Sequence, residues 1–214
     1  MDDISRITSF ILEVDRLKGV LRKTQPLAVD RPENSAEHSW QVALLATLLV
    51  SHSSQSVDLA RVVEILLVHD IPEIVIGDVI VYSGHDPARQ QEEARAARQL
   101  FGMLPESDAT RCFELWLEYE QRETPESRYA YAVDRLMPIL HNLQRGGGTW
   151  REFGITLEQV LAINGVTGEV LPEVWDRVSA EVTACFAEMA ASNWPAHQAG
   201  AHEVESARKR TARC

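Results

Sequence analysis

Four side chains in this sequence have the chemistry of ligands to a divalent metal ion. They are two imidazoles and two carboxylates from three separate segments of the chain: His38, His69, Asp70 and Asp134. Imidazole nitrogens and carboxylate oxygens suit first-row divalent ions and leave coordination positions for water and substrate. A lone His–Asp dipeptide is more often a hydrogen-bonded pair in a protein core. The four residues together, in the order H…HD…D, are far more specific and predict a metal site.

The His–Asp pair closes a predicted helix over residues 59–70. Apolar residues recur along this helix at helical spacing: Leu59, Val62, Val63, Leu66 and Leu67. One face of the helix is therefore expected to be buried. His69 and Asp70 continue that buried stripe instead of pointing to water. Because an unpaired buried charge costs several kcal/mol or shifts its pKa until it is neutral, the pair needs a partner, and a cation is one candidate.

Two further helices are predicted to carry the other two ligands. A capping-box pattern opens a helix over residues 34–50, and His38 lies on its apolar face. Asp134 lies among apolar residues of a helix over residues 125–144. Pro138 lacks the amide that would bond the carbonyl of Asp134, so a local distortion is expected there. Three helices are thus predicted to meet at the metal site.

The overall composition limits what else the chain can do. Its 214 residues can bury one substantial core, so a single domain is expected. The formal net charge of −11 argues against broad binding to nucleic acid, although a few local cations and a metal could still hold a small anion. Neither a membrane span nor a secretory leader is expected. Cys112, Cys185 and Cys214 have no metal-binding spacing, which fits a reducing cytoplasm.

Hydrophobic periodicity is helical nearly throughout and predicts an all-α fold. We expect a single helical bundle over residues 1–194, with the metal site between helices, and a polar, disordered tail over residues 195–214. Residues 74–84 are expected to form an ordered loop or a short helical turn, and Gly146–Gly148 a flexible break. The remaining histidines considered are assigned to surface, loop or tail positions: His85, His141, His197 and His202.

The sequence also resembles a known enzyme family from about Val14 to Trp150. Four segments carry the resemblance: RPENSAEHSW, LLVHDIPEIVIGD, FELWLEYE and AVDRL. They are similar to segments of the HD-domain metal-dependent phosphohydrolases, in the branch of the bacterial 5′-deoxynucleotidases and HD domain-containing protein 2. The resemblance implies an all-helical HD-domain fold and one divalent ion per chain, cobalt, manganese or similar, on the four ligands. It also implies hydrolysis of nucleoside 5′-monophosphates, chiefly 2′-deoxyribonucleotides, by a homodimer.

The resemblance further points to Glu73 and Asp78 as catalytic carboxylates. Glu73 follows Asp70 by about one helical turn, so it could reach a metal-bound water and transfer its proton without being a ligand. Asp78 follows Gly77, a place where the backbone can approach a ligand closely. The alternatives are an exposed first-turn carboxylate for Glu73 and a turn or N-cap aspartate for Asp78.

Arg22 and Lys23 are the predicted substrate-binding residues. They lie on the approach to the His38 helix, where their charge could neutralise a substrate phosphate, Arg22 in a bidentate way. The deoxynucleotidase branch has an arginine that matches Arg22. Without that match, both residues would be interpreted as solvated surface cations. Glu118 and Glu120 either support the metal shell from a second sphere or belong to a solvated helix face.

Two positions depart from the deoxynucleotidase pattern. Those enzymes carry a tryptophan where Lys23 stands here, and a threonine- and proline-containing segment where this chain has Val79–Tyr82. Neither change touches the metal ligands. Both bear on selectivity for 2′-deoxyribose and for monophosphates over other phosphate esters.

The sequence therefore predicts a cytoplasmic phosphohydrolase that acts on a nucleotide, with neither nucleic acid nor a membrane as a partner. One alternative is a non-catalytic or regulatory nucleotide-binding module of the same fold, and another is a hydrolase of a different phosphate ester. Two-metal HD-domain oxygenase chemistry is a third. It needs additional histidines between the HD pair and Asp134, and His85 alone lies in that interval.

Overall fold

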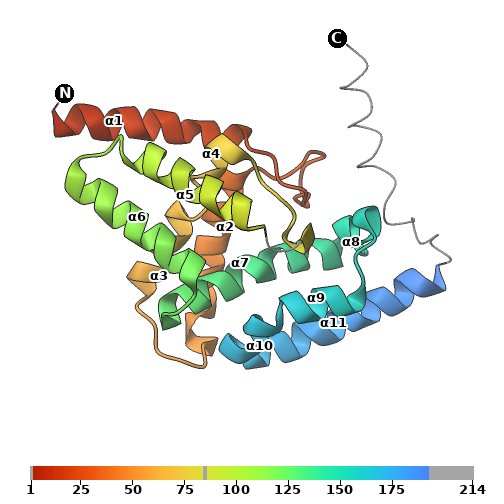
Figure 1. The fold of residues 1–214 in the computed structure, drawn as a ribbon. Coiled ribbons are helices and arrows are strands. Elements are labelled where there is room, and N and C mark those ends of the chain that lie inside the picture. The colour runs from red at the N-terminus through yellow and green to blue at the C-terminus, as the bar shows by residue number, and fades with distance from the viewer. Residues whose placement is uncertain (1, 84–85, 193–214) are drawn as a thin grey trace, which may run out of the picture.

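The computed structural model describes residues 2–83 and 86–192, and the regular structure of these residues is helical (Figure 1). The prediction of an all-α fold is confirmed. In the same residues, β geometry is limited to one antiparallel bridge between Leu21 and Asn34. The bridge ties the loop after the first helix to the start of the helix that carries His38. The predicted tail lies outside the described residues, as do His85, His197, His202 and Cys214.

The longer helices are α1 (Asp3–Val14), α2 (Ser35–Leu49), α3 (Leu59–Val68), α5 (Pro87–Phe101), α6 (Glu106–Gln121), α7 (Pro125–Gln144) and α11 (Pro172–Ala191). The shorter helices are α4 (Glu73–Ile76), α8 (Gly148–Phe153), α9 (Leu157–Ile163) and α10 (Gly165–Val170). Short 3₁₀ helices lie at Asp15–Gly19, Val50–His52 and Val81–Ser83. The segment 74–84 thus contains short helical turns, as its sequence predicts.

Local sequence signals explain where the helices that carry the site begin. At the start of α2, Asn34 Oδ1 accepts the Glu37 amide at 2.9 Å and Glu37 Oε1 accepts the Asn34 amide at 2.8 Å. This is the predicted capping box. Before α3, the Asp58 carboxylate accepts amide groups of the first helical turn. Thr124 caps α7 in the same way, and Pro125 follows as its first residue.

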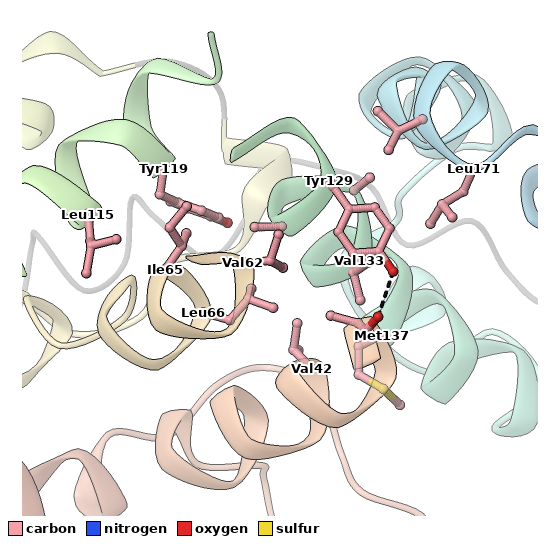
Figure 2. Packing of buried hydrophobic residues seen from close by; sticks show 14 residues of the cluster. Val42, Val62, Ile65, Leu66, Leu115, Tyr119, Tyr129, Val133, Met137 and Leu171 are labelled. Atoms are coloured by element: carbon pink, nitrogen blue, oxygen red, sulfur yellow. Dashed lines mark hydrogen bonds between the residues drawn. The ribbon is translucent and has the colours of Figure 1, made fainter. Parts of the chain in front are cut away.

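Helix α7 is the central helix of the molecule (Figure 1). It packs against α2, α3, α6 and α10, and the buried side chains of these helices form one apolar cluster (Figure 2). The cluster includes Val42, Val62, Ile65, Leu66, Leu115, Val133, Met137 and Leu171. Tyr129 lies within it and donates its hydroxyl to the Ala46 carbonyl at 2.7 Å. Burial of these groups fixes α2, α3 and α7 relative to one another.

One residue of the predicted apolar stripe is not buried. Leu67 of α3 is 52% exposed, whereas Val62 and Leu66 are fully buried. Successive helical residues point about 100° apart, so Leu67 lies beyond the edge of the stripe and the prediction for it is wrong. His69 and Asp70, at the end of α3, are buried as predicted.

The helices after α7 pack along one side of it (Figure 1). Trp150 is buried and stacks on Phe186 with ring centroids 5.3 Å apart. Cys185 is buried, Cys112 is half-buried, and both are free thiols. In the described part of the chain, no helix has the length and apolar character needed to cross a membrane.

Candidate metal centre

Helices α2, α3 and α7 bring two imidazoles and a carboxylate to one buried point. His38 Nε2 lies 2.7 Å from Asp134 Oδ1, and His69 Nε2 lies 3.7 Å from the same oxygen. One possible ligand atom from each residue lies within 4.8 Å of the other two, and all three side chains are buried. The structure therefore assembles a His–His–Asp group that could hold a metal ion.

The two imidazoles aim Nε2 at this point because Nδ1 faces another partner in each case. His69 Nδ1 lies 2.9 Å from the Leu66 carbonyl oxygen, which favours a proton on Nδ1. His38 Nδ1 faces the buried carboxylate of Glu33 at 3.3 Å, an arrangement common for metal-bound histidine. His69 Nε2 itself is buried without a hydrogen-bond partner. A nitrogen left free in this way suits a cation.

The electrostatics of the group also favour a cation. Burial lowers the pKa of the His69 imidazole, but the carboxylates of Asp70 and Asp134 outweigh it and raise that pKa to about 9. Burial raises the pKa of Asp134, but Arg135 and the two histidines hold it well below its usual range. The site keeps its carboxylate ionised and attracts positive charge, so the residues present fit a divalent metal ion.

Asp70 lies at the rim of the group. Its Oδ1 is 3.1 Å from His69 Nε2, and its Oδ2 accepts a hydrogen bond from Arg22 Nη1 at 3.2 Å. One oxygen therefore faces the imidazoles and the other faces an arginine. Asp70, the fourth predicted ligand, thus contacts His69 but lies outside the His–His–Asp group.

Glu73 opens the short helix α4, just beyond Asp70. Ser35 donates its hydroxyl to Glu73 Oε2 at 2.6 Å. Burial, together with the negative charge of Asp70, raises the pKa of Glu73 to about 8. A carboxyl group in this range can exchange protons near neutral pH. The side chain is partly buried, unlike the exposed carboxylate of the alternative interpretation.

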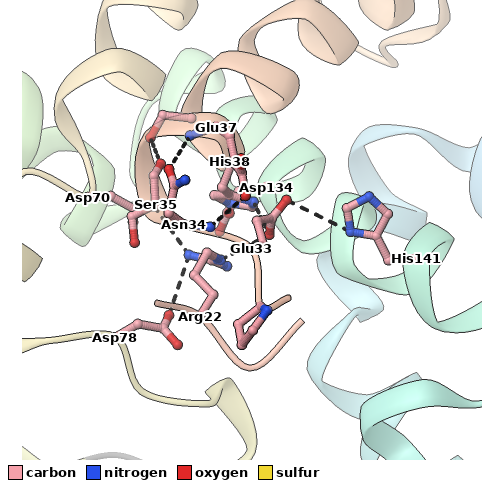
Figure 3. Close-up of polar contacts among 12 residues, drawn as sticks. Arg22, Glu33, Asn34, Ser35, Glu37, His38, Asp70, Asp78, Asp134 and His141 are labelled. Atoms are coloured by element: carbon pink, nitrogen blue, oxygen red, sulfur yellow. Dashed lines mark hydrogen bonds and ion pairs between the residues drawn. The ribbon is translucent and has the colours of Figure 1, made fainter. Parts of the chain in front are cut away.

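Arg22 joins three acidic side chains of the site (Figure 3). Its Nη1 lies 3.2 Å from Asp70 Oδ2 and 3.4 Å from Asp78 Oδ1, and its Nε lies 3.4 Å from Glu33 Oε2. Burial raises the pKa of Asp78, and the charge of Arg22 opposes that shift. Asp78 follows Gly77, whose φ of 73° suits glycine. Arg22 is therefore part of the site and not a solvated surface cation.

An open cleft adjoins Arg22 and Asp70. Charged side chains line part of it: Arg22, Lys23, Asp70, Glu73, Asp78 and Arg135. Lys23 is exposed. Apolar and amide side chains line another part: Val79–Tyr82, Pro138, Ile139 and Asn142. The cleft could thus hold an anionic group beside Arg22 and Asp70 and an organic body further along.

Sequence analysis missed three polar side chains that touch the centre: Glu33, Tyr119 and Arg135. Glu33 is 1% exposed and faces His38 and Arg22. Tyr119 and Arg135 both donate to Asp134 Oδ2. All three stand within the segments that carry the family resemblance, directly beside residues singled out there. Nothing in the helical periodicity marks them as contacts of the centre.

The prediction for His141 is wrong. It lies in α7, is 3% exposed, and has Nδ1 3.9 Å from Glu33 Oε1. His141 follows Asp134 by about two helical turns, so both lie on the same buried face of α7. The helical spacing from Asp134 could therefore have predicted that His141 is buried.

Glu118 and Glu120 have different surroundings. Glu118 is buried, and accepts hydrogen bonds from Arg61 Nε at 2.8 Å and from the Thr124 hydroxyl. It ties α6 to α3 and to the start of α7, and belongs neither to the metal shell nor to a solvated face. Glu120 lines another pocket, which His69 also lines.

Curated relatives with similar sequences carry the name 5′-deoxynucleotidase. The protein HDDC2 of Xenopus laevis is 27% identical over 117 residues, and HDDC2 of Homo sapiens is 28% identical over 138 residues. These matches cover 54% and 61% of this chain and 57% and 65% of the two relatives. The chain thus spans less than two thirds of their length.

Two solved structures extend the similarity over more of the chain. A "predicted metal-dependent phosphohydrolase" from Magnetospirillum magnetotacticum MS-1 is 37% identical, with a TM-score of 0.81 over 86% of this chain and 96% of that one. The PH0347 protein from Pyrococcus horikoshii OT3 is 23% identical, with a TM-score of 0.62 over 81% of this chain and 99% of its own. The second similarity shows a common fold.

The HD domain family matches residues 14–175. That region contains α2, α3 and α7, and with them every residue of the His–His–Asp group. The chain belongs to the HD-domain family.

Proposed function

We propose that this chain is a metal-dependent phosphohydrolase that removes phosphate from nucleoside 5′-monophosphates, chiefly 2′-deoxyribonucleotides. The observation that carries the proposal is the buried group of His38, His69 and Asp134, in which His69 Nε2 has no hydrogen-bond partner. Membership of the HD-domain family supports the same chemistry. The names of the curated relatives and of the Magnetospirillum structure support the reaction class.

In this proposal, one divalent ion per chain, cobalt, manganese or a similar ion, is held by His38, His69, Asp70 and Asp134. When bound, such an ion polarises a phosphoryl oxygen and lowers the pKa of a water molecule. Arg22 offsets the negative charge of the phosphate, and Lys23 adds charge at the exposed part of the cleft. Burial reduces solvent screening of the Arg22 charge, and Asp70 and Asp78 hold the guanidinium in place.

Glu73 is the proposed proton acceptor for the attacking water. The Ser35 hydroxyl holds Oε2 at 2.6 Å, so the other carboxylate oxygen can take the proton. A pKa raised to about 8 by burial and by Asp70 suits proton transfer near neutral pH. Asp78, held by Arg22 at 3.4 Å, is the second proposed catalytic carboxylate and orients the water on that side.

The apolar and amide part of the cleft is the proposed site for the sugar and base. Val79–Tyr82, Ile139 and Asn142 line this part. The departures at Lys23 and Val79–Tyr82 mean that the contacts that select the sugar are not those of the bacterial deoxynucleotidases. The preference for 2′-deoxyribose is therefore supported by the names of the relatives, not by matching residues.

We also propose a homodimer in a cytoplasmic setting. An apolar stripe on α2 supports the dimer, because Trp40, Leu44 and Leu48 recur every helical turn and are 64%, 45% and 66% exposed. A second copy of the chain would cover this stripe in a symmetric interface. The free thiols Cys112 and Cys185 support a reducing compartment.

The test is release of inorganic phosphate from a panel of nucleoside and 2′-deoxynucleoside 5′-monophosphates. Protein stripped of metal is assayed with and without added cobalt or manganese. We expect metal-dependent release, fastest from deoxynucleotides and abolished by EDTA. Nucleotide binding without turnover would favour the regulatory alternative, and turnover of other phosphate esters alone would favour a different substrate. Turnover that is insensitive to EDTA would contradict the proposed chemistry.

A further inference from the structure

The two carboxylate oxygens of Asp134 face different partners. Oδ1 faces the histidines, at 2.7 Å from His38 Nε2 and 3.7 Å from His69 Nε2. Oδ2 accepts a hydrogen bond from the Tyr119 hydroxyl at 2.6 Å and two more from Arg135, from Nε at 3.1 Å and Nη2 at 2.8 Å. Three donors therefore hold one oxygen, while the other stays on the side of the imidazoles.

The contact between Arg135 and Asp134 is unusual for residues adjacent on a helix. Such neighbours point about 100° apart, so their side chains do not ordinarily face each other. Here the Arg135 side chain folds back, with its guanidinium carbon 5.1 Å from the centre of the Tyr131 ring. It is 19% exposed. Packing on an aromatic face and burial thus hold the guanidinium against the carboxylate.

We propose that Arg135 is a positioning residue of the metal centre, which, with Tyr119, fixes Asp134 so that Oδ1 alone serves as a ligand. The inference rests on the proposed function, because it concerns the affinity of the proposed metal site. Partners that orient a ligand from outside typically change metal affinity by about 10- to 100-fold. Arg135 therefore sets how tightly the metal binds.

Arg135 also lines the substrate cleft, so a direct contact with substrate is the competing interpretation. The two roles differ in what they change. A positioning role through Asp134 weakens the binding of metal in the absence of substrate and leaves KM for the nucleotide near its normal value once metal is saturating. A substrate contact raises KM at saturating metal and leaves metal affinity unchanged.

The experiment measures Mn²⁺ affinity by calorimetry on the full chain stripped of metal. Arg135→Gln removes the charge, Arg135→Lys keeps the charge but not the two-point contact, and Tyr119→Phe removes only the hydroxyl. Arg128→Gln is the matched control, because Arg128 lies on the same helix and pairs with Glu169 at the surface. We expect affinity to fall about 10-fold or more in Arg135→Gln and Tyr119→Phe, to fall less in Arg135→Lys, and to stay unchanged in the control.

Unfolding midpoints and far-UV circular dichroism establish that each variant is folded. The Lys variant keeps the inference testable if Arg135→Gln fails to fold. Wild-type Mn²⁺ affinity in a folded Arg135→Lys or Tyr119→Phe variant, or a raised KM alone, would overturn the positioning role while leaving the proposed function intact. Absence of Mn²⁺ binding by the wild-type chain would overturn both.

Discussion

Each carboxylate at the centre has its own polar partner. Ser35 donates to Glu73, Arg22 contacts Asp70, and Asp134 is held by its neighbour and by a tyrosine. In each of these three carboxylates, the partner holds one oxygen and does not hold the other. In the proposed function, Asp70 and Asp134 would bind a cation, and Glu73, with Asp78, would handle the proton of the water.

Glu73→Ala is expected to keep the metal and lose most of the turnover. General-base catalysis of this kind contributes about 10²- to 10⁴-fold in rate, and the imidazoles and Asp134 are untouched by the change. The measurements are metal content per chain and kcat at saturating metal. Glu64→Gln serves as the control, because Glu64 lies on α3 and forms a surface ion pair with Arg111. A Glu73→Ala protein with wild-type kcat would remove this residue from the mechanism.

Arg22 and Lys23 offer a matched pair for the phosphate contact. Arg22→Gln removes a buried cation placed among Asp70 and Asp78 and is expected to lower kcat/KM by about 10- to 100-fold, since charged hydrogen bonds contribute about 1.5–3 kcal/mol. Lys23→Gln removes an exposed cation and is expected to change kcat/KM less. Steady-state kinetics on one nucleotide measures kcat/KM for both variants. Equal effects of the two substitutions would contradict the assigned roles.

The three residues of the His–His–Asp group could be predicted from the sequence because residue type and burial coincide. His38, His69 and Asp134 each interrupt an apolar helical pattern, and such interruptions are expensive unless paired. Glu33 and Arg135 could not be recognised in this way. Glu33 stands in a loop without periodicity, and Arg135 contacts its own neighbour by folding back along the helix.

At the scale of elements, helix starts were the most predictable feature. The Asn34–Glu37 capping box and Pro125 mark the first turns of α2 and α7 through local hydrogen bonds that the sequence contains in full. Which side chains of each helix are buried was less predictable. The exposure of Leu67 and the burial of His141 depend on which neighbouring helices pack there, and that is tertiary information.

The turn after α7 gives a prediction at this scale. Gly148 has a φ of 34°, and a Cβ there would lie 2.4 Å from Asn142 Oδ1, an oxygen that accepts the Thr149 amide at 2.8 Å. Gly148→Ala is expected to lower the free energy of unfolding by about 1–3 kcal/mol. Gly165→Ala is the control, because no atom lies within 4 Å of the position that its methyl group would take, and it should be neutral or stabilising by up to about 1 kcal/mol.

Urea unfolding followed by circular dichroism measures both glycine variants. Equal stability of the two would mean that the turn relaxes without cost. The segment that the sequence predicts as a flexible break is, in the structure, tied to α7 by Asn142, whose carbonyl also accepts the Gly147 amide at 2.9 Å. Because Asn142 lines the cleft, a displaced turn would also reach the substrate site.

At the scale of the whole molecule, α2 has one buried and one exposed apolar face. His38 lies on the buried face, and the stripe of Trp40, Leu44 and Leu48 lies on the exposed one. A partner on the exposed face would brace the helix that carries the first ligand. The sequence predicts the buried face that carries His38, but the exposure of the Trp40, Leu44 and Leu48 stripe could not be predicted, because α2 is apolar around most of its circumference.

Leu48→Lys is expected to convert the proposed dimer into a monomer, because it places a charge in an apolar interface. Size-exclusion chromatography with light scattering measures the mass directly. Leu12→Lys on α1, where the side chain is 74% exposed, is the control and should leave the dimer intact. A monomeric wild-type chain would rule out the dimer without affecting the metal centre.

In the proposed function, α2, α3 and α7 together hold one divalent ion. The most direct measurement is cobalt bound per chain after stripping with a chelator, reloading and removal of excess ion, determined by mass spectrometry of the element. We predict close to one ion per wild-type chain and almost none in folded His38→Ala and Asp134→Ala variants. A wild-type chain that retains no cobalt, or variants that retain as much as wild type, would contradict the claim.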